Sequence, residues 1–268
     1  MTLTETPART ARELEAFRRR VDEVVHRHPV VTDNRYTKWF ATGAATDDEV
    51  RHLTVQFSVF SHLFVEAQLR KVINAADVES YHAGKEILMN ELGVVFNGTP
   101  DDEGVSTEGT VDGSRYRHRA AHFEWLLRFA APLGLRFEQL GKRRHATPST
   151  LLFCDELLRI YGSDDSSIAE GASYAVEHWA AAGFWKELIA GLRAFKAREC
   201  PELNLSFWTW HDKVEDQHAA HTADELEEAF FTPGFDEERF LRGAAEMLDG
   251  VKAFWDGLEA DRVAGRTE

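Results

Sequence analysis

Hydrophobic residues recur at helical spacing through most of this 268-residue chain, and this periodicity restricts the fold more than any other feature. In residues 46–75, for example, Leu53, Phe57, Phe60 and Phe64 fall on one side of a helix. We find neither convincing strand alternation nor a glycine-rich phosphate loop. The sequence therefore predicts an all-α protein.

Capping residues, prolines and glycines divide the pattern into separate helices. Thr46 and Glu49 match a capping box, and Ser167 begins a second one. Thr147 and Asp236 are also typical helix-capping residues. The predicted helices cover residues 9–28, 46–75, 77–92, 115–133, 135–142, 147–161, 167–198, 203–231 and 236–262, with 34–43 as a connection.

We expect one helical domain over residues 1–268, because no linker or internal repeat interrupts the chain. Residues 1–45 are predicted to form an N-terminal helix and its connection, 46–231 the core that carries the candidate ligands, and 235–263 a C-terminal helix. Residues 94–114 are rich in Gly, Asp and Thr and are predicted to be a long insertion loop.

The composition excludes several classes of function. The formal net charge is -15, from 31 basic and 46 acidic residues, which disfavours binding to nucleic acid or to an anionic membrane. Cys154 and Cys200 fit no zinc-binding pattern, so two reduced thiols are expected. The first 20 residues lack an apolar signal region, and no run is long enough for a membrane helix. We therefore expect a soluble, cytoplasmic protein.

The segment 207–218 carries the clearest candidate for chemistry. His211, Glu215 and His218 are spaced by four and three residues, which places them within about 60° of one another on a helix. Asp216 would lie about 100° further round and face elsewhere. Two imidazoles and a carboxylate on one stripe suit iron or manganese.

Other predicted helices contribute similar residue types. Glu91 ends one helix, His118 and His122 lie four residues apart on the next, and Glu177 follows on a third. Bundles that bind two metal ions assemble their sites from carboxylates and His that project inward from facing helices. Among these candidate ligands, Glu215 to His218 is the one Glu-x-x-His pair, so they do not match the ferritin-like pattern, which uses two such pairs.

Glu66 has two interpretations. It lies in the middle of an apolar helix, where a carboxylate is costly unless it is paired or bound to a metal. Arg70 follows four residues later, so a surface ion pair is the alternative.

The order of these residues resembles the heme-oxygenase-like diiron oxidases and oxygenases. The resemblance covers roughly residues 46–221, favours His122 over His118, and implies a heme-oxygenase-like helical bundle. It departs from the family in the 94–114 insertion and in having Glu215 where many members have Asp. It rests on Asn90-Glu91-Leu92-Gly93, His122 to Phe129 with Leu133-Gly134-Leu135, Tyr174 to Glu177, and His211 to His218.

The resemblance also implies a ligand set and a chemistry. Two iron ions would be held by Glu91, His122, Glu177, His211, Glu215 and His218. In the N-oxygenating branch an extra carboxylate comes from the first core helix, and Glu66 lies at the matching place. By helical spacing, Phe207 lies one turn before His211 and Tyr174 one turn before Glu177, so both would lie above the metals, either as core residues or as substrate contacts that line a pocket.

The implied enzyme activates O2 through a peroxo-diiron(III) species and needs an external electron donor. N-oxygenation of the amine of a small molecule or amino acid is the first expectation. Oxidative C–C cleavage or desaturation of an amino or fatty acid is the alternative. A homodimer is the expected assembly.

Two other classes remain open from the sequence. The fold could bind heme through His26 or His28, although the carboxylates would then have no role. Alternatively, the chain could be a metal-free helical module whose His and Glu side chains are solvated.

Overall fold

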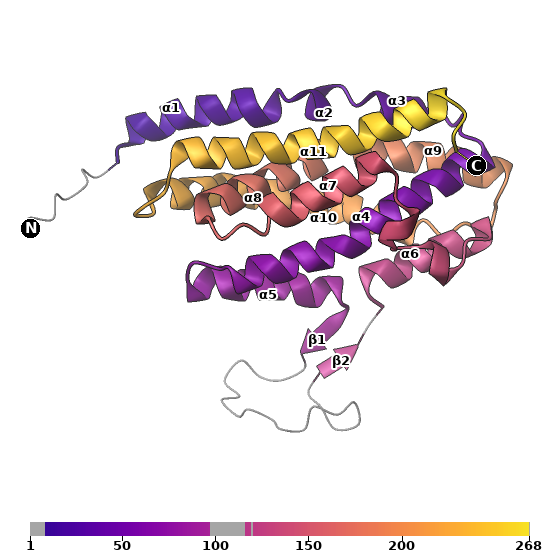
Figure 1. Cartoon of the computed structure of the whole chain (residues 1–268), viewed down its shortest axis with the longest axis horizontal. Coiled ribbons are helices and arrows are strands. Elements are labelled where there is room, and N and C mark those ends of the chain that lie inside the picture. Colours follow the sequence, from indigo (N-terminus) through magenta and orange to yellow (C-terminus); the bar gives the residue numbers. More distant parts are fainter. Residues whose placement is uncertain (1–8, 97–115, 119, 268) are drawn as a thin grey trace, which may run out of the picture.

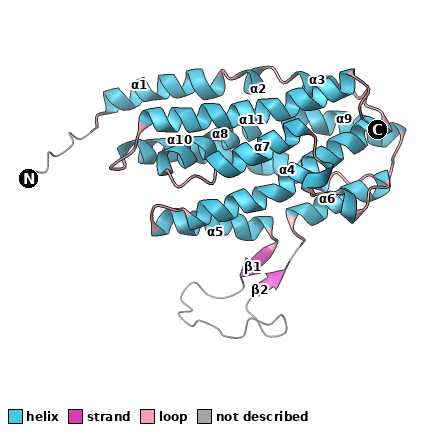
Figure 2. Cartoon of the chain, viewed as in Figure 1, coloured by secondary structure: helices cyan, strands magenta, loops and turns pink. Residues whose placement is uncertain are grey.

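The computed structural model describes residues 9–96, 116–118 and 120–267, but not the side chains of residues 95–96, 116–118 and 214–225. Long helices lie side by side and make up most of the described chain (Figures 1 and 2). They are α1 (Ala11–Val21), the π-helical turn η1 (Asp22–His26), α2 (Pro29–Thr32), α3 (Arg35–Phe40), α4 (Asp47–Ile73), α5 (Val78–Glu91), α6 (His122–Ala130), the 3-10 turns η2 (Ala131–Leu133), η3 (Phe137–Gln139) and η4 (Arg143–His145), α7 (Pro148–Ile160), α8 (Ser166–Ala181), α9 (Phe184–Arg198), α10 (Ser206–Phe231) and α11 (Glu237–Val263).

Helices α11 and α8 approach so closely that only glycine fits at their crossing. A Cβ on Gly171 of α8 would lie 2.0 Å from the carbonyl oxygen of Phe240, and one on Gly243 of α11 would lie 2.3 Å from that of Ile168. Helix α11 also packs against α7, as Figure 1 shows along the upper half of the bundle. These contacts place one face of α8 on α11 and leave another for α10, which also packs against α8.

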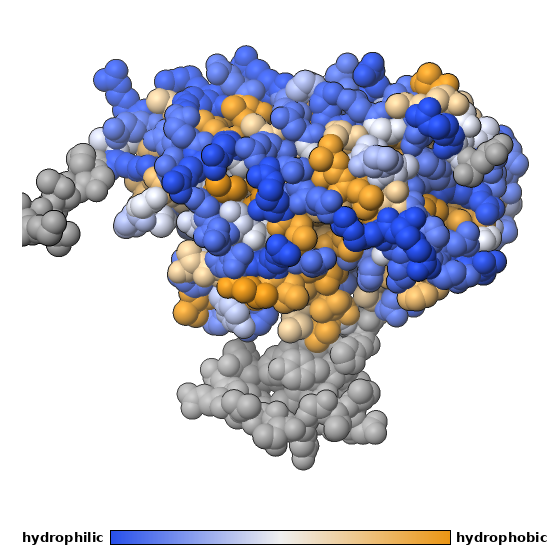
Figure 3. Space-filling view, in the orientation of Figure 1, coloured by the Kyte–Doolittle hydropathy of each residue, from blue (hydrophilic) through white to orange (hydrophobic). Residues whose placement is uncertain are grey.

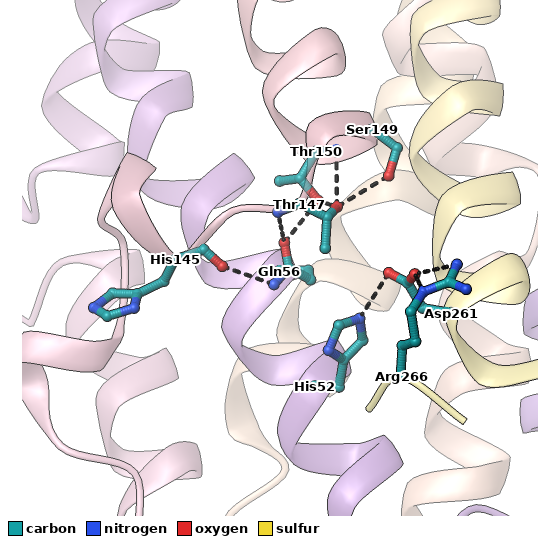
Figure 4. A network of polar contacts seen from close by, with 8 residues as sticks. All are labelled: His52, Gln56, His145, Thr147, Ser149, Thr150, Asp261 and Arg266. Carbon is teal, nitrogen blue, oxygen red and sulfur yellow. Dashed lines mark hydrogen bonds and ion pairs between the residues drawn. The ribbon is translucent and has the colours of Figure 1, made fainter. Parts of the chain in front are cut away.

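Helix α4 is anchored to the start of α7 by a buried glutamine. Gln56 is 3 % exposed, and its amide nitrogen donates to the carbonyl oxygen of His145 at 2.9 Å. Its amide oxygen accepts from the backbone nitrogen of Thr147 and from the hydroxyl of Thr150, both at 2.9 Å. Figure 4 shows this network beside the contact between Nε2 of His52 and a carboxylate oxygen of Asp261 in α11, 3.4 Å apart. The network fixes α4 relative to α7 and α11 along its N-terminal half.

The insertion begins and ends in a short antiparallel ladder. Strand β1 (Val94–Phe96) pairs with β2 (Tyr116–His118), with Val94 opposite His118 and Phe96 opposite Tyr116. Each strand has three residues, which is too short for an alternating pattern to stand out in the sequence. The helix predicted over 115–133 is therefore shorter, and begins at His122. The middle of the predicted 94–114 loop lies outside the described residues.

Two other predicted boundaries were wrong. The helix predicted over 167–198 is two helices, because Gly183 takes a φ of 94° between α8 and α9, a left-handed conformation that favours glycine. The cap of α8 is Asp165, whose side chain accepts from the backbone nitrogen of Ile168, and not Ser167 with Glu170. By contrast, Thr46, Thr147 and Asp236 cap their helices as predicted.

The surface is mainly polar, with one apolar concentration. Leu69 and Ile73 of α4 and Val78 and Tyr81 of α5 are exposed, and Figure 3 shows hydrophobic residues gathered over the lower part of the molecule where these helices lie. Among the described helices, none has an apolar stretch long enough to cross a bilayer.

Candidate metal centre

His211 of α10 is held in one orientation and one tautomer. Its Nδ1 lies 2.7 Å from the carbonyl oxygen of Phe207, one turn earlier. A carbonyl oxygen can only accept, so Nδ1 carries the proton and donates it. The other nitrogen, Nε2, then keeps its lone pair, which is the form in which imidazole binds a metal ion.

Aromatic rings surround His211 and remove it from water. The ring of Trp185 stacks on it with centroids 4.9 Å apart and an interplanar angle of 21°, and the ring of Phe207 lies 4.4 Å away. Burial, with a smaller contribution from the neighbouring His122, lowers the pKa of His211 to about 3. The imidazole is therefore neutral at neutral pH, so a metal ion need not displace a proton from it.

Glu91 and His122 meet across the insertion. The Oε1 atom of Glu91, at the end of α5, lies 3.1 Å from Nδ1 of His122, at the start of α6. Their side chains are only 15 % and 8 % exposed. The alignment does not meet hydrogen-bond geometry, so Nδ1 of His122 is a buried polar atom without a hydrogen bond. Such an atom beside a carboxylate is a donor pair suited to a cation.

His122 also lies against His211. Their ring centroids are 5.1 Å apart and nearly perpendicular, with an interplanar angle of 79°. His122 of α6 is therefore in contact with Glu91 of α5 on one side and with His211 of α10 on the other. Among the side chains that the structure describes, no three His, Cys, Asp or Glu lie close enough together to hold a metal ion.

The remaining predicted ligands lie on α10 and on the helix beside it. Glu215 and His218 belong to α10, but their side chains fall outside the described residues, so the prediction for them stays a prediction. Glu177 lies on α8, which packs against α10, and its side chain is half-buried. The described donors in contact with one another are the carboxylate of Glu91 and the imidazoles of His122 and His211. These group types fit a cation such as iron or manganese.

Glu66 is not brought to the other candidates. Its side chain is 52 % exposed and lies 3.9 Å from Arg70, the surface pair that the sequence offered as the alternative. Phe57 and Gln68 lie roughly 180–200° around α4 from Glu66. The ring of Phe57 packs edge-on against that of Phe207 of α10, with centroids 6.0 Å apart. The amide nitrogen of Gln68 donates to the carbonyl oxygen of Gly84 in α5. Glu66 therefore faces away from the helices that carry Glu91 and His211.

The two predicted substrate contacts lie in different places. Phe207 is 1 % exposed and packs directly on His211. The ring of Tyr174 stacks on that of His178, with centroids 4.0 Å apart, and its centroid lies 5.7 Å from that of Phe240 of α11. Tyr174 thus belongs to a different aromatic cluster from Phe207. Burial raises the pKa of the Tyr174 hydroxyl to about 12.

Sequence reasoning missed three tryptophans at the centre. Besides Trp185, the ring of Trp210 lies 4.6 Å from His122, and that of Trp125 lies 5.4 Å from it. Trp210 precedes His211 in the sequence, and Trp125 follows His122 by three residues, so both were visible as neighbours of ligands. Trp185 comes from α9, and no local pattern connects it with His211.

The histidines considered for heme have other partners. Nδ1 of His28 accepts from the backbone nitrogen of Val30 at the start of α2, and its Nε2 lies 3.4 Å from Asp249. Nδ1 of His26 lies 3.3 Å from Asp22. His28 therefore acts as a helix cap with both nitrogens engaged.

Solved structures resemble this arrangement over its whole length. A CADD-like protein of unknown function from Nostoc punctiforme aligns with a TM-score of 0.63 at 15% identity, covering 95% of this chain and 98% of that one. A domain of unknown function with a heme oxygenase-like fold from Shewanella denitrificans aligns with a TM-score of 0.58 at 14% identity, covering 96% of this chain and 95% of that one.

This chain has a heme oxygenase-like fold. The fold predicted from the sequence is thereby confirmed. Within it, α10 packs against α6 and α8, and α6 packs against α5. No family model and no curated protein matches the chain. At this level of identity the solved structures establish the fold alone.

Proposed function

We propose that this chain is an O2-activating non-heme diiron oxidase or oxygenase. The contacts of His122 with Glu91 and with His211, together with the His211 tautomer that binds metal, are the observation that carries the proposal. The heme oxygenase-like fold and the similarity to a CADD-like protein support it.

The proposed ligands are Glu91, His122, Glu177, His211, Glu215 and His218. Carboxylate oxygens and imidazole nitrogens together suit iron or manganese better than structural zinc. When bound, two ferrous ions would bind O2 and supply the electrons for its activation.

The chain's own residues prepare this chemistry. The hydrogen bond from Nδ1 of His211 to Phe207 keeps Nε2 directed away from its own helix backbone. The stacked ring of Trp185 and the ring of Phe207 exclude water from one side of His211. A dry site protects reactive species from hydrolysis and proton leakage.

The substrate is proposed to be a small amine, an amino acid or a fatty acid. N-oxygenation was expected from Glu66 as an additional ligand. The exposed position of Glu66 beside Arg70 favours instead a site with six protein ligands and the second candidate, oxidative C–C cleavage or desaturation of an amino or fatty acid. In both cases an external reductant must supply electrons between turnovers. The cytoplasmic location and the homodimer stay predictions.

Iron retention by variants tests the proposal. After anaerobic loading with Fe(II) and desalting, His122→Ala and His211→Ala should lose most of the bound iron. His82→Ala is the matched control, because His82 is an exposed histidine on α5. Equal iron in all four proteins, the wild type included, would contradict the assignment of these ligands.

A further inference from the structure

Four buried tryptophans share an unusual property. The indole nitrogens of Trp179, Trp185, Trp208 and Trp255 are buried and have no hydrogen-bond partner. Burying an unpaired N–H carries a desolvation penalty, so such groups are rare in folded proteins. Their concentration in one part of the core requires an explanation beyond hydrophobic packing.

Two of these tryptophans connect His211 with the surface. The ring of Trp185 stacks on that of His211, with centroids 4.9 Å apart. The ring of Phe184 comes next, with its centroid 4.5 Å from that of Trp185 and 5.6 Å from that of Trp255. Phe57 provides a second bridge, at 5.7 Å from Trp185 and 6.5 Å from Trp255. The aromatic rings are thus in contact from the candidate ligand to Trp255.

The outer end of this series opens on a surface hollow. Trp255 lines a hollow of ≈ 280 Å³ between α2, α3 and α11, although its own side chain is only 2 % exposed. Arg35, Lys252 and Asp256 line the same hollow. A small water-soluble reductant in the hollow would therefore reach the immediate neighbourhood of the indole.

We propose that Trp185 and Trp255 form a tryptophan relay that delivers electrons from a reductant in this hollow to the oxidised metal site; this inference rests on the proposed function. When reaction with O2 has oxidised the site beyond the diferric state, which is itself too weak an oxidant, the indole of Trp185 would give it one electron and become a radical cation. Trp255 returns one electron to Trp185, and a one-electron reductant of the ascorbate or thiol class reduces Trp255. Each passage moves one electron inward and breaks no bond.

The unpaired indole nitrogens suit this role. The N–H of an oxidised indole is far more acidic than that of the neutral ring, and it loses its proton readily when an acceptor is hydrogen-bonded to the nitrogen. Trp185 and Trp255 have no such acceptor, so each radical cation keeps its proton and remains able to take up an electron. The relay therefore carries charge without trapping it as a neutral radical.

Trp210 and Trp125 offer a competing route. The ring of Trp210 lies 5.0 Å from His211, and Trp125 lies 5.3 Å from Trp210. Both side chains are half-buried, and neither indole is among the unpaired buried ones. Oxidation that ends on this pair, independently of Trp185, would overturn the relay.

The first experiment uses the metal-free protein, so that the relay is tested separately from iron binding. A photo-oxidised ruthenium trisbipyridine complex in solution withdraws electrons from accessible indoles, and mass spectrometry locates the oxidised tryptophans. Trp185 should be oxidised in the wild type and in Trp208→Phe, and should be protected in Trp255→Phe. Oxidation of Trp185 that is unchanged by Trp255→Phe would overturn the proposal.

The second experiment uses protein loaded with Fe(II) and mixed with O2 without substrate, followed by rapid-freeze EPR. The wild type should form an indole radical that ascorbate removes. Trp185→Phe should lose the radical, whereas Trp255→Phe should keep it and respond to ascorbate more slowly. Trp208→Phe is the control, because Trp208 is equally buried but does not line the hollow.

The two experiments separate the two proposals. If the chain binds no iron but oxidation of Trp185 depends on Trp255, the proposed function fails and the electron path stands. If iron binds and O2 reacts, but Trp185→Phe and Trp255→Phe give the same EPR radical and the same response to ascorbate as the wild type, the relay is wrong and the proposed function stands.

Discussion

The Oε1 atom of Glu91 lies 3.1 Å from Nδ1 of His122, although the 94–114 insertion separates the two residues in the sequence. The ladder between β1 and β2 explains this proximity. Because Val94 lies opposite His118, the chain leaves α5 and returns to α6 at the same place. The insertion can therefore be long without separating a carboxylate from the imidazole that it faces.

This arrangement predicts that the insertion can be shortened without loss of the centre. Replacing residues 97–115 by Asn-Gly would connect β1 to β2 by a two-residue type I′ turn, which Asn-Gly favours in hairpins. Iron content after anaerobic loading should equal that of the full chain, because Glu91 and His122 stay adjacent. A shortened protein that folds but binds no iron would show that the insertion itself contributes to the centre.

Glu66 and Glu91 should respond differently to the same substitution. Glu66→Ala removes an exposed ion pair with Arg70 and should change the free energy of unfolding by less than about 1 kcal/mol, with iron content unchanged. Glu91→Ala should lower iron content. Urea unfolding and iron analysis measure both effects. Loss of iron from Glu66→Ala would show that α4 rearranges on metal binding and would restore the argument for N-oxygenation.

Gln56→Ala should destabilise the fold. It leaves the half-buried carbonyl oxygen of His145 and the backbone nitrogen of Thr147 without their partner, and it removes one of the two partners of the Thr150 hydroxyl (Figure 4). We expect a loss of roughly 2–4 kcal/mol in the free energy of unfolding. Ser149→Ala, at the edge of the network, removes one bond to Thr147 and should cost less than about 1.5 kcal/mol. Equal effects would argue against a clamp centred on Gln56.

The His52–Asp261 pair predicts a pH dependence of stability. Burial lowers the pKa of His52 below its ordinary value of 6.5, and the attraction of Asp261 only partly opposes this effect. The unfolded chain therefore binds a proton more readily than the folded one, so stability is full above about pH 6.5 and falls as the pH decreases. Urea unfolding of the wild type and of His52→Gln at several pH values isolates this contribution. A smaller pH slope is expected for the variant, and an equal slope would assign the dependence to other buried histidines.

The sequence predicted those features that depend on neighbouring residues. The caps at Thr46 and Asp236 each involve a side chain and a backbone nitrogen within three residues, so local pattern was sufficient. The end of α8 was missed because one glycine, Gly183, carries the signal, and a glycine within a helical pattern does not by itself end a helix.

The candidate centre was only partly predictable for the same reason. The spacing from His211 to His218 is a property of one helix, whereas the rotation of α4 depends on all its neighbours. Buried residues such as Leu53, Thr54 and Val59 lie on different sides of α4, so no polar stripe marks its solvent face. The side of α4 on which Glu66 lies therefore became clear only from its packing.

Anaerobic loading with Fe(II), followed by mixing with O2, tests the central claim most directly. The account predicts two irons per chain and a transient visible absorbance after mixing, both lost in His211→Ala and both kept in His82→Ala. Iron no higher than background, or a single weak site that His211→Ala leaves intact, would contradict the diiron proposal and leave a helical module of another function.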